Sequence, residues 1–112
     1  DCSLQSFCDM VAQTIDLMGE DNVGIGTDLC QDQPDSVVEW MRVGRWTKSI
    51  DYGEGSANKP GFPDMPNWFG RNLDFSNIST GLKNTGMDAS MISKVMGGNW
   101  FKFFRNSFES KM

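Results

Sequence analysis

The sequence contains no histidine and only three cysteines in 112 residues, Cys2, Cys8 and Cys30. Without histidine, neither a Ser-His-Asp nor a Cys-His catalytic arrangement can form within this chain. No two cysteines form a CxxC pair, which argues against a structural zinc site. We expect reduced thiols and hence a cytoplasmic location, while one disulfide among the three stays open.

Lysine and arginine are absent from residues 1–41, which contain nine acidic residues. Residues 1–41 therefore carry a charge of −9 and the other 71 residues a charge of +4, which together give the net charge of −5. Such an acidic chain is a poor partner for nucleic acid, because phosphate neutralisation needs clustered basic residues. The ordinary interpretation of the acidic part is a solvated helix face.

Long apolar runs are also absent, and none approaches the roughly 20 residues of a membrane span. We therefore expect no membrane span. There is no signal peptide, and the first residue is Asp1 rather than methionine, which indicates a processed or truncated chain. A length of 112 residues suits one domain, whereas a whole α/β barrel needs roughly 250 residues.

Residues 3–18 predict an amphipathic helix, because apolar residues recur at the i, i+3, i+4 and i+7 positions. Ser3 is expected to cap its start, and Gly19 to end it in the left-handed conformation. Residues 22–27 then predict a short strand in which apolar residues alternate with glycine. A helix, a tight turn and a strand in this order are typical of the α/β class.

The rest of the chain predicts helices separated by irregular segments. The expected helices run from Pro34 to about Val43, around residues 78–85 after a cap at Ser76 or Asn77, from a cap at Asp88 through Met96, and over residues 100–108. Residues 44–70 are rich in Gly, Pro, Asp and Asn and predict an irregular excursion. The aromatic residues of the final helix are expected to be core rather than binding surface. A lone strand must pair with a neighbour, so its partner strands are expected in another chain or in a missing N-terminal portion.

Asp28 directly follows the predicted strand and is the candidate catalytic residue. Catalytic groups gather at the carboxyl ends of strands in parallel α/β proteins. From the residues alone, the more ordinary interpretation is an aspartate that caps the next turn or is solvated. The preceding Gly24-Ile25-Gly26 lacks the third glycine of a dinucleotide loop and the GK[ST] of a phosphate loop, so no nucleotide role is expected.

Two blocks go beyond such generic patterns, residues 15–29 (IDLMGEDNVGIGTDL) and residues 86–104 (GMDASMISKVMGGNWFKFF). The first resembles the G-x-D-H-V-G-I-G-[ST]-D-F segment of the membrane (renal) dipeptidase family of zinc metallopeptidases. The second resembles the C-terminal block of the same family, G-[YW]-x-x-x-x-I-x-K-[IV]-[LM]-G-x-N-[FW]-x-[RK]. The blocks occur in the family's order, and the resemblance covers residues 4–29 and about 73–105 of the chain.

The resemblance implies the α/β class and, more closely, the C-terminal segment of a TIM-barrel-like (β/α)8 metallohydrolase, mostly helical, with residues 22–27 as the last barrel strand. The family hydrolyses the peptide bond of dipeptides with two metal ions, usually zinc, which can polarise the carbonyl and hold a bridging hydroxide. Asp28 matches the aspartate of the GIG[ST]D motif. The resemblance implies that it accepts the proton of the attacking water or positions that water.

The sequence also departs from the family pattern. Asn22 stands where the family usually has histidine, and Leu29 stands where it has phenylalanine. The family's metal ligands are histidines and carboxylates of earlier strands, which this chain lacks. We therefore expect no metal ligand in this chain, no zinc bound by it and no catalysis by it alone. A dipeptide substrate, two zinc ions and the remainder of the barrel, or another copy of the chain, would complete the enzyme.

A function of a different class stays open. The aromatic residues gathered between positions 100 and 108 also suit a small helical interaction module. In that hypothesis the C-terminal helix docks against a partner protein.

Overall fold

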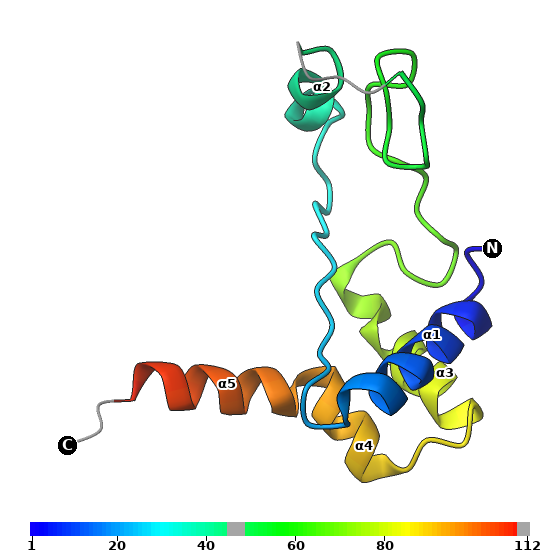
Figure 1. Ribbon diagram of the computed structural model, residues 1–112. Helices are drawn as coiled ribbons and strands as arrows, with labels where there is room; N and C mark the ends of the chain where they lie inside the picture. Colours follow the sequence, from blue (N-terminus) through cyan, green and yellow to red (C-terminus); the bar gives the residue numbers. More distant parts are fainter. Residues whose placement is uncertain (45–48, 110–112) are drawn as a thin grey trace.

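The computed structural model describes residues 1–44 and 49–109, which are mostly helical or irregular (Figure 1). The helices are α1 (Leu4–Met18), α2 (Ser36–Arg42), α3 (Phe75–Asn84), α4 (Ala89–Ser93) and α5 (Asn99–Phe108). A 3-10 turn, η1 (Asn72–Asp74), precedes α3, and a π-helical turn, η2 (Lys94–Gly98), joins α4 to α5. Within the described ranges, no helix is long and apolar enough to cross a membrane.

Helix α1 has the ends that its sequence predicts. The Ser3 hydroxyl accepts a hydrogen bond from the Ser6 N–H at 3.1 Å, and the Asp1 carboxylate accepts from the Ser3 N–H at 3.1 Å. Such side-chain acceptors satisfy amides that the first helical turn leaves unpaired. At the other end Gly19 has a φ of 88°, and its N–H donates to the Ile15 carbonyl at 2.7 Å. The predicted cap Ser3 is confirmed, and Gly19 ends α1 with the positive φ that glycine permits, although its ψ of 148° is not that of the left-handed helix.

The core lies where α1 packs against α3, beside α4 and η2. Its buried residues are Cys8, Val11, Ile15, Val23, Phe69, Ile78, Leu82 and Val95. Gly81 of α3 lets the two helices approach closely, because a Cβ there would lie 2.7 Å from Cys8 Sγ and 2.9 Å from Leu4 Cγ. The apolar stripe predicted for residues 3–18 is thus the buried face of α1 as far as Ile15, whereas Met18 at its end is 52% exposed. The acidic residues of the helix stay exposed.

Residues 22–27 form no strand, which corrects the predicted α/β class and barrel segment. They run as an extended connection from the end of α1 toward α2 (Figure 1). The pairing found in the described residues is a single isolated bridge between Ser56 and Lys59. Apolar–glycine alternation suits any extended segment, whereas a strand also needs a paired backbone. Here the carbonyls of Val23 and Ile25 accept hydrogen bonds from α5 side chains instead.

Helix α2 and residues 49–65 stand apart from the core, linked to it by extended connections (Figure 1). The helix predicted from Pro34 to about Val43 is confirmed as α2. The excursion predicted over 44–70 is irregular where the structure describes it, and residues 45–48 lie outside the described residues. The Asp35 carboxylate accepts from the Phe62 N–H at 3.2 Å and so fastens the excursion to the start of α2.

The helices predicted after residue 75 are present with one change. Helix α3 confirms the helix predicted around residues 78–85, but it begins at Phe75, so Ser76 and Asn77 lie inside it and are not its caps. The Asp74 carboxylate closes the turn before α3 by accepting from the Gly70 N–H at 2.9 Å. The segment predicted as a helix over 88–96 begins as α4, where the Asp88 carboxylate accepts from the Met91 N–H at 2.8 Å. It continues as η2 rather than as a regular helix, with non-helical backbone at Gly97.

Helix α5 projects from the core as an arm (Figure 1). None of its described side chains is buried, and the exposed fraction of its aromatic residues runs from 43% at Trp100 to 80% at Phe108. The prediction that these aromatic residues form core is therefore wrong for the described part of the chain. Their spacing gives an apolar face, which among the described residues is covered in part at Trp100, beside Gly24 and Ile25, and stays largely exposed beyond it.

Candidate functional site

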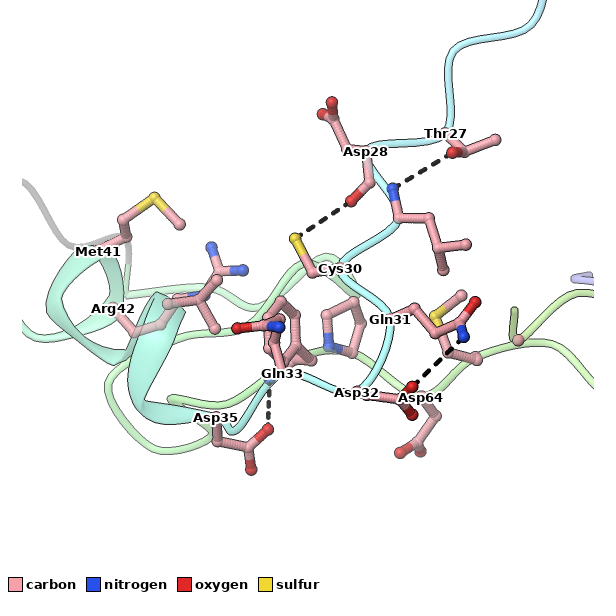
Figure 2. Close-up of a pocket in the computed structure, with 16 residues that line it drawn as sticks. Thr27, Asp28, Cys30, Gln31, Asp32, Gln33, Asp35, Met41, Arg42 and Asp64 are labelled. Carbon is pink, nitrogen blue, oxygen red and sulfur yellow. Dashed lines mark hydrogen bonds between the residues drawn. The ribbon is translucent and has the colours of Figure 1, made fainter. Parts of the chain in front are cut away.

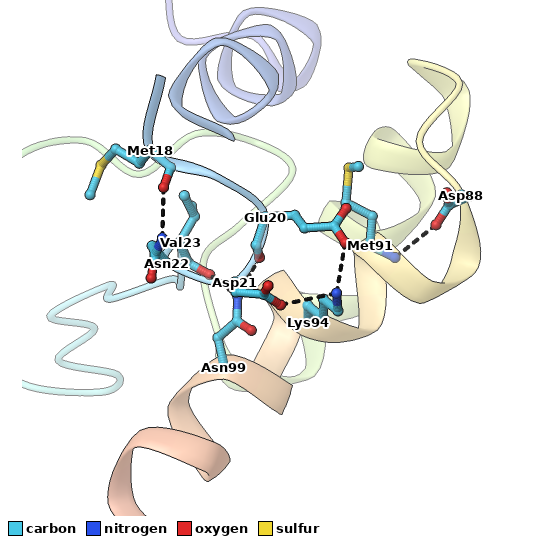
Figure 3. A network of polar contacts seen from close by, with 9 residues as sticks. All are labelled: Met18, Glu20, Asp21, Asn22, Val23, Asp88, Met91, Lys94 and Asn99. Carbon is cyan, nitrogen blue, oxygen red and sulfur yellow. Dashed lines mark hydrogen bonds and ion pairs between the residues drawn. The ribbon is translucent and has the colours of Figure 1, made fainter. Parts of the chain in front are cut away.

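The two sequence blocks quoted above meet in space, where the turn after α1 contacts η2 and the start of α5 (Figure 3). Lys94 Nζ donates to Glu20 Oε1 at 2.7 Å and lies 3.0 Å from Asp21 Oδ1. The three side chains are partly exposed to solvent. Ion pairs in this setting contribute little stability, so their main effect is to fix which surfaces face each other.

These contacts shift the pKa of both partners in the direction that keeps them charged. The hydrogen bond from Lys94 lowers the pKa of Asp21 below its usual 3.8. Hydrogen bonds to Glu20 and Asp21 raise the pKa of Lys94 above its usual 10.5. Both groups are therefore ionised at neutral pH, and the attraction between them is weakened by salt.

Asn99 joins the same turn through two hydrogen bonds. Its Nδ2 donates to the Glu20 carbonyl at 2.7 Å and to the Val23 carbonyl at 2.8 Å. The Asn99 N–H also donates to the Lys94 carbonyl across η2, an i→i+5 bond of the π-helical type. In a regular α-helix, residues five apart differ by about 140° around the axis. The wider turn brings Lys94 and Asn99 toward one side, and both side chains reach residues 20–23.

Trp100 continues this junction along the extended segment. Its indole Nε1 donates to the Ile25 carbonyl at 3.0 Å. A Cβ at Gly24 would lie 2.6 Å from that Nε1, so the indole can cover the backbone only because residue 24 is glycine. At Gly26 a Cβ would meet nothing within 4 Å. The two glycines of the motif therefore have different structural roles in this chain.

Asn22, which replaces the usual histidine of the family pattern, has a structural contact of its own. Its Nδ2 donates to the Met18 carbonyl at 2.7 Å, one of the unpaired carbonyls at the end of α1 (Figure 3). The side chain therefore caps the end of α1.

Asp28, the predicted catalytic residue, is exposed and has a φ of 50°. Aspartate adopts this left-handed conformation more readily than most residues. Its neighbours hold the turn, because the Thr27 hydroxyl accepts from the Leu29 N–H at 3.2 Å and Cys30 Sγ donates to the Asp28 carbonyl at 3.5 Å. Figure 2 shows the Asp28 carboxylate pointing away from those of the other labelled aspartates.

An open hollow of about 1060 Å³ lies beside Asp28, between residues 27–35, α2 and residues 62–65. The acidic side chains along it are Asp28, Asp32, Asp35 and Asp64. Arg42 is the one cation that lines it, and its Nε is buried without a hydrogen-bond partner among the described residues. Farther along, Gln31 Oε1 accepts from the Asn72 N–H at 2.8 Å, which ties this wall to η1.

The aspartates of the hollow do not converge on a common point. Across residues 1–44 and 49–109, no group of three or more His, Cys, Asp or Glu side chains could hold a metal ion. The described residues therefore do not fit a zinc centre. The sequence singled out Asp28 but missed Glu20, Lys94 and Asn99 as a bonded junction, and only their places within the two blocks pointed to them.

Comparison with protein-family models, with curated proteins and with solved structures gives no match to this chain.

Proposed function

We propose that this chain is the C-terminal part of a metal-dependent dipeptidase, which hydrolyses the peptide bond of dipeptides. The observation that supports the proposal is the junction of the two blocks. Lys94, Asn99 and Trp100 of the second block bind the backbone and side chains of residues 20–25 in the first. Two segments that resemble one family separately are thus parts of one structural unit.

Asp28 is the residue that acts on substrate in this proposal. Its carboxylate is exposed, so a water molecule can come within hydrogen-bond distance of it. The segment that carries it is anchored on both sides, at Ile25 by Trp100 and at Gln31 by Asn72. Such anchors limit how far the carboxylate moves and so favour a defined geometry for proton transfer.

The zinc ions of this proposal are held by residues outside this chain, because the described residues offer no ligand group. The chain alone is therefore inactive in this proposal. The polypeptide that completes the enzyme must supply histidine and carboxylate ligands, including a His-x-Asp motif. A complete polypeptide without that motif contradicts the proposal.

The test is dipeptide hydrolysis by the complete polypeptide in the presence of zinc, with Asp28→Asn as the variant. Removing a general base typically lowers kcat by about 10²- to 10⁴-fold. Asp32→Asn is the matched control, because Asp32 is also exposed, lines the same hollow and has a φ of 60°. We expect the control to stay within about 3-fold of the parent, as befits a surface substitution. Equal activity of the two variants contradicts the role of Asp28.

The exposed aromatic residues of α5 favour a second candidate, a helical module that docks against a partner protein. Such a module must fold without its partner. We expect this chain alone to give a well-dispersed amide spectrum. In Phe104→Asp we expect the amide signals to change only in α5. A molten spectrum of the chain alone contradicts this candidate, since orphan apolar faces then collapse without fixed packing.

A further inference from the structure

The aromatic face of α5 is an apolar surface that the described residues leave largely uncovered. Its members are Trp100, Phe101, Phe103, Phe104 and Phe108, and each is at least 43% exposed. The rings contact one another along the helix, with centroids 5.5 Å apart between Trp100 and Phe104 and 5.9 Å apart between Phe104 and Phe108. A contiguous apolar surface of this kind marks an interaction site.

The charges beside this aromatic face are basic. Lys102 and Arg105 lie on α5 between the aromatic positions, and Glu109 follows the end of the helix. A partner that covers the aromatic face must therefore bring apolar side chains together with acidic ones. Two α5 helices packed face to face would instead place lysine and arginine of one copy near those of the other, which is unfavourable.

The outer face of α1 has the complementary pattern. Met10 and Leu17 are exposed by 54% and 86%. Asp9 and Asp16 lie exposed on the same helix, and no Lys or Arg occurs among residues 1–41. At about 1.5 Å per residue, the 15 residues of α1 offer a face longer than the 10 residues of α5.

We propose that a second copy of this chain covers the aromatic face, with α5 of each copy lying along the outer face of α1 in the other. In this arrangement the aromatic rings meet Met10 and Leu17, and Lys102 and Arg105 meet Asp9 and Asp16. The exchange is reciprocal, as two-fold symmetry requires, and each copy contributes both surfaces. The inference rests on the docking-module candidate and names its partner.

The first test is the molar mass of this chain in solution, measured by light scattering at several concentrations. We expect the mass of two chains for the parent and of one chain for Phe104→Asp with Phe108→Asp, since a buried charge is costly at an interface. Leu73→Asp is the control, because Leu73 is 68% exposed on η1, away from both faces. Its mass is expected to equal that of the parent.

The second test uses charge reversal to identify which faces meet. Asp9→Lys with Asp16→Lys, and Lys102→Glu with Arg105→Glu, are each expected to weaken self-association at least about 10-fold. Mixing the two variants restores opposite charges across both contacts of a reciprocal pair. We therefore expect the mixture to regain the mass of two chains.

Three results overturn the proposal. A parent chain that is folded but has the mass of one chain at every concentration excludes a second copy, while the docking-module candidate survives. If the double variant Asp9→Lys with Asp16→Lys forms the two-chain species as strongly as the parent, α1 is excluded as the docking face. A single chain whose α5 binds vesicles of mixed neutral and acidic phospholipid assigns the aromatic face to a membrane surface. None of these readouts depends on dipeptide hydrolysis.

Discussion

The substitution Asn99→Ala tests whether the junction between the two blocks holds the structure together. Asn99 Nδ2 donates hydrogen bonds of 2.7 and 2.8 Å to the Glu20 and Val23 carbonyls, in a partly buried setting. Each such bond contributes about 1 kcal/mol net. Alanine therefore removes about 2 kcal/mol from the free energy of unfolding, before its higher helix propensity is considered.

Asn106→Ala supplies the control for that propensity. Asn106 is exposed on the same helix, and the change from asparagine to alanine is the same. Both variants gain about 0.5 kcal/mol of helix propensity, so this contribution cancels in their difference. The remaining difference of about 2 kcal/mol measures the two hydrogen bonds.

Urea unfolding at one fixed protein concentration measures this difference. With a slope of about 1.5 kcal/mol per molar urea, the midpoint of Asn99→Ala is expected about 1.3 M below that of Asn106→Ala. A difference in free energy below about 0.5 kcal/mol would refute the reasoning, because it is less than one hydrogen bond contributes. It would mean that α5 and the turn after α1 are joined by contacts other than Asn99.

Gly81→Ala forces a Cβ to within 2.7 Å of Cys8 Sγ, so we expect a loss of about 1–3 kcal/mol in thermal or urea unfolding, while Gly26→Ala, with nothing within 4 Å, changes little. Equal effects of the two glycine substitutions would contradict the close approach of α1 and α3. Because Asp21 has its pKa lowered below 3.8, its contribution to stability is present above that pH and is lost as pH falls through the folded-state pKa. Asp21→Asn should therefore make the urea midpoint depend less on pH between about pH 5 and pH 2, and high salt should reduce the difference between variant and parent. If the variant and the parent lose stability equally as the pH falls, the contact with Lys94 is contradicted. Cys2 and Cys30 are exposed thiols, whereas burial raises the pKa of Cys8, so iodoacetamide should label two sites quickly and the third only on unfolding. Equal labelling rates at all three would show that α1 does not bury Cys8.

Local rules predicted the helices of this chain well, because the determining contacts lie close in sequence. The caps at Ser3 and Gly19 and the helix at 34–43 depend on neighbours within a few residues. Apolar spacing likewise placed the buried face of α1 correctly. Each of these features follows from one turn of backbone and its side chains.

The errors arose where a distant partner decides the structure. Apolar–glycine alternation at 22–27 was interpreted as a strand, but its carbonyls are met by Asn99 and Trp100, about 75 positions away. The aromatic spacing of 100–108 was interpreted as core, yet periodicity cannot say whether a covering surface exists. For the candidate site, the sequence proposed Asp28 and the structure places it in an exposed turn, which leaves its catalytic role a prediction.

The junction between the turn after α1 and the start of α5 also has a kinetic consequence. Its hydrogen bonds join residues separated by 74 to 79 positions, so about two-thirds of the chain must close into one loop before they form. Closing a loop of that size costs about 4 kcal/mol of chain entropy. The individual helices form without that cost, whereas the packing of α1 against α3 joins Cys8 to Gly81 and closes a loop of similar size. The junction is therefore expected late on the folding route, with or after that packing. Asn99→Ala should then speed unfolding while leaving the folding rate nearly unchanged, which marks α5 as the last element to dock and the first to leave.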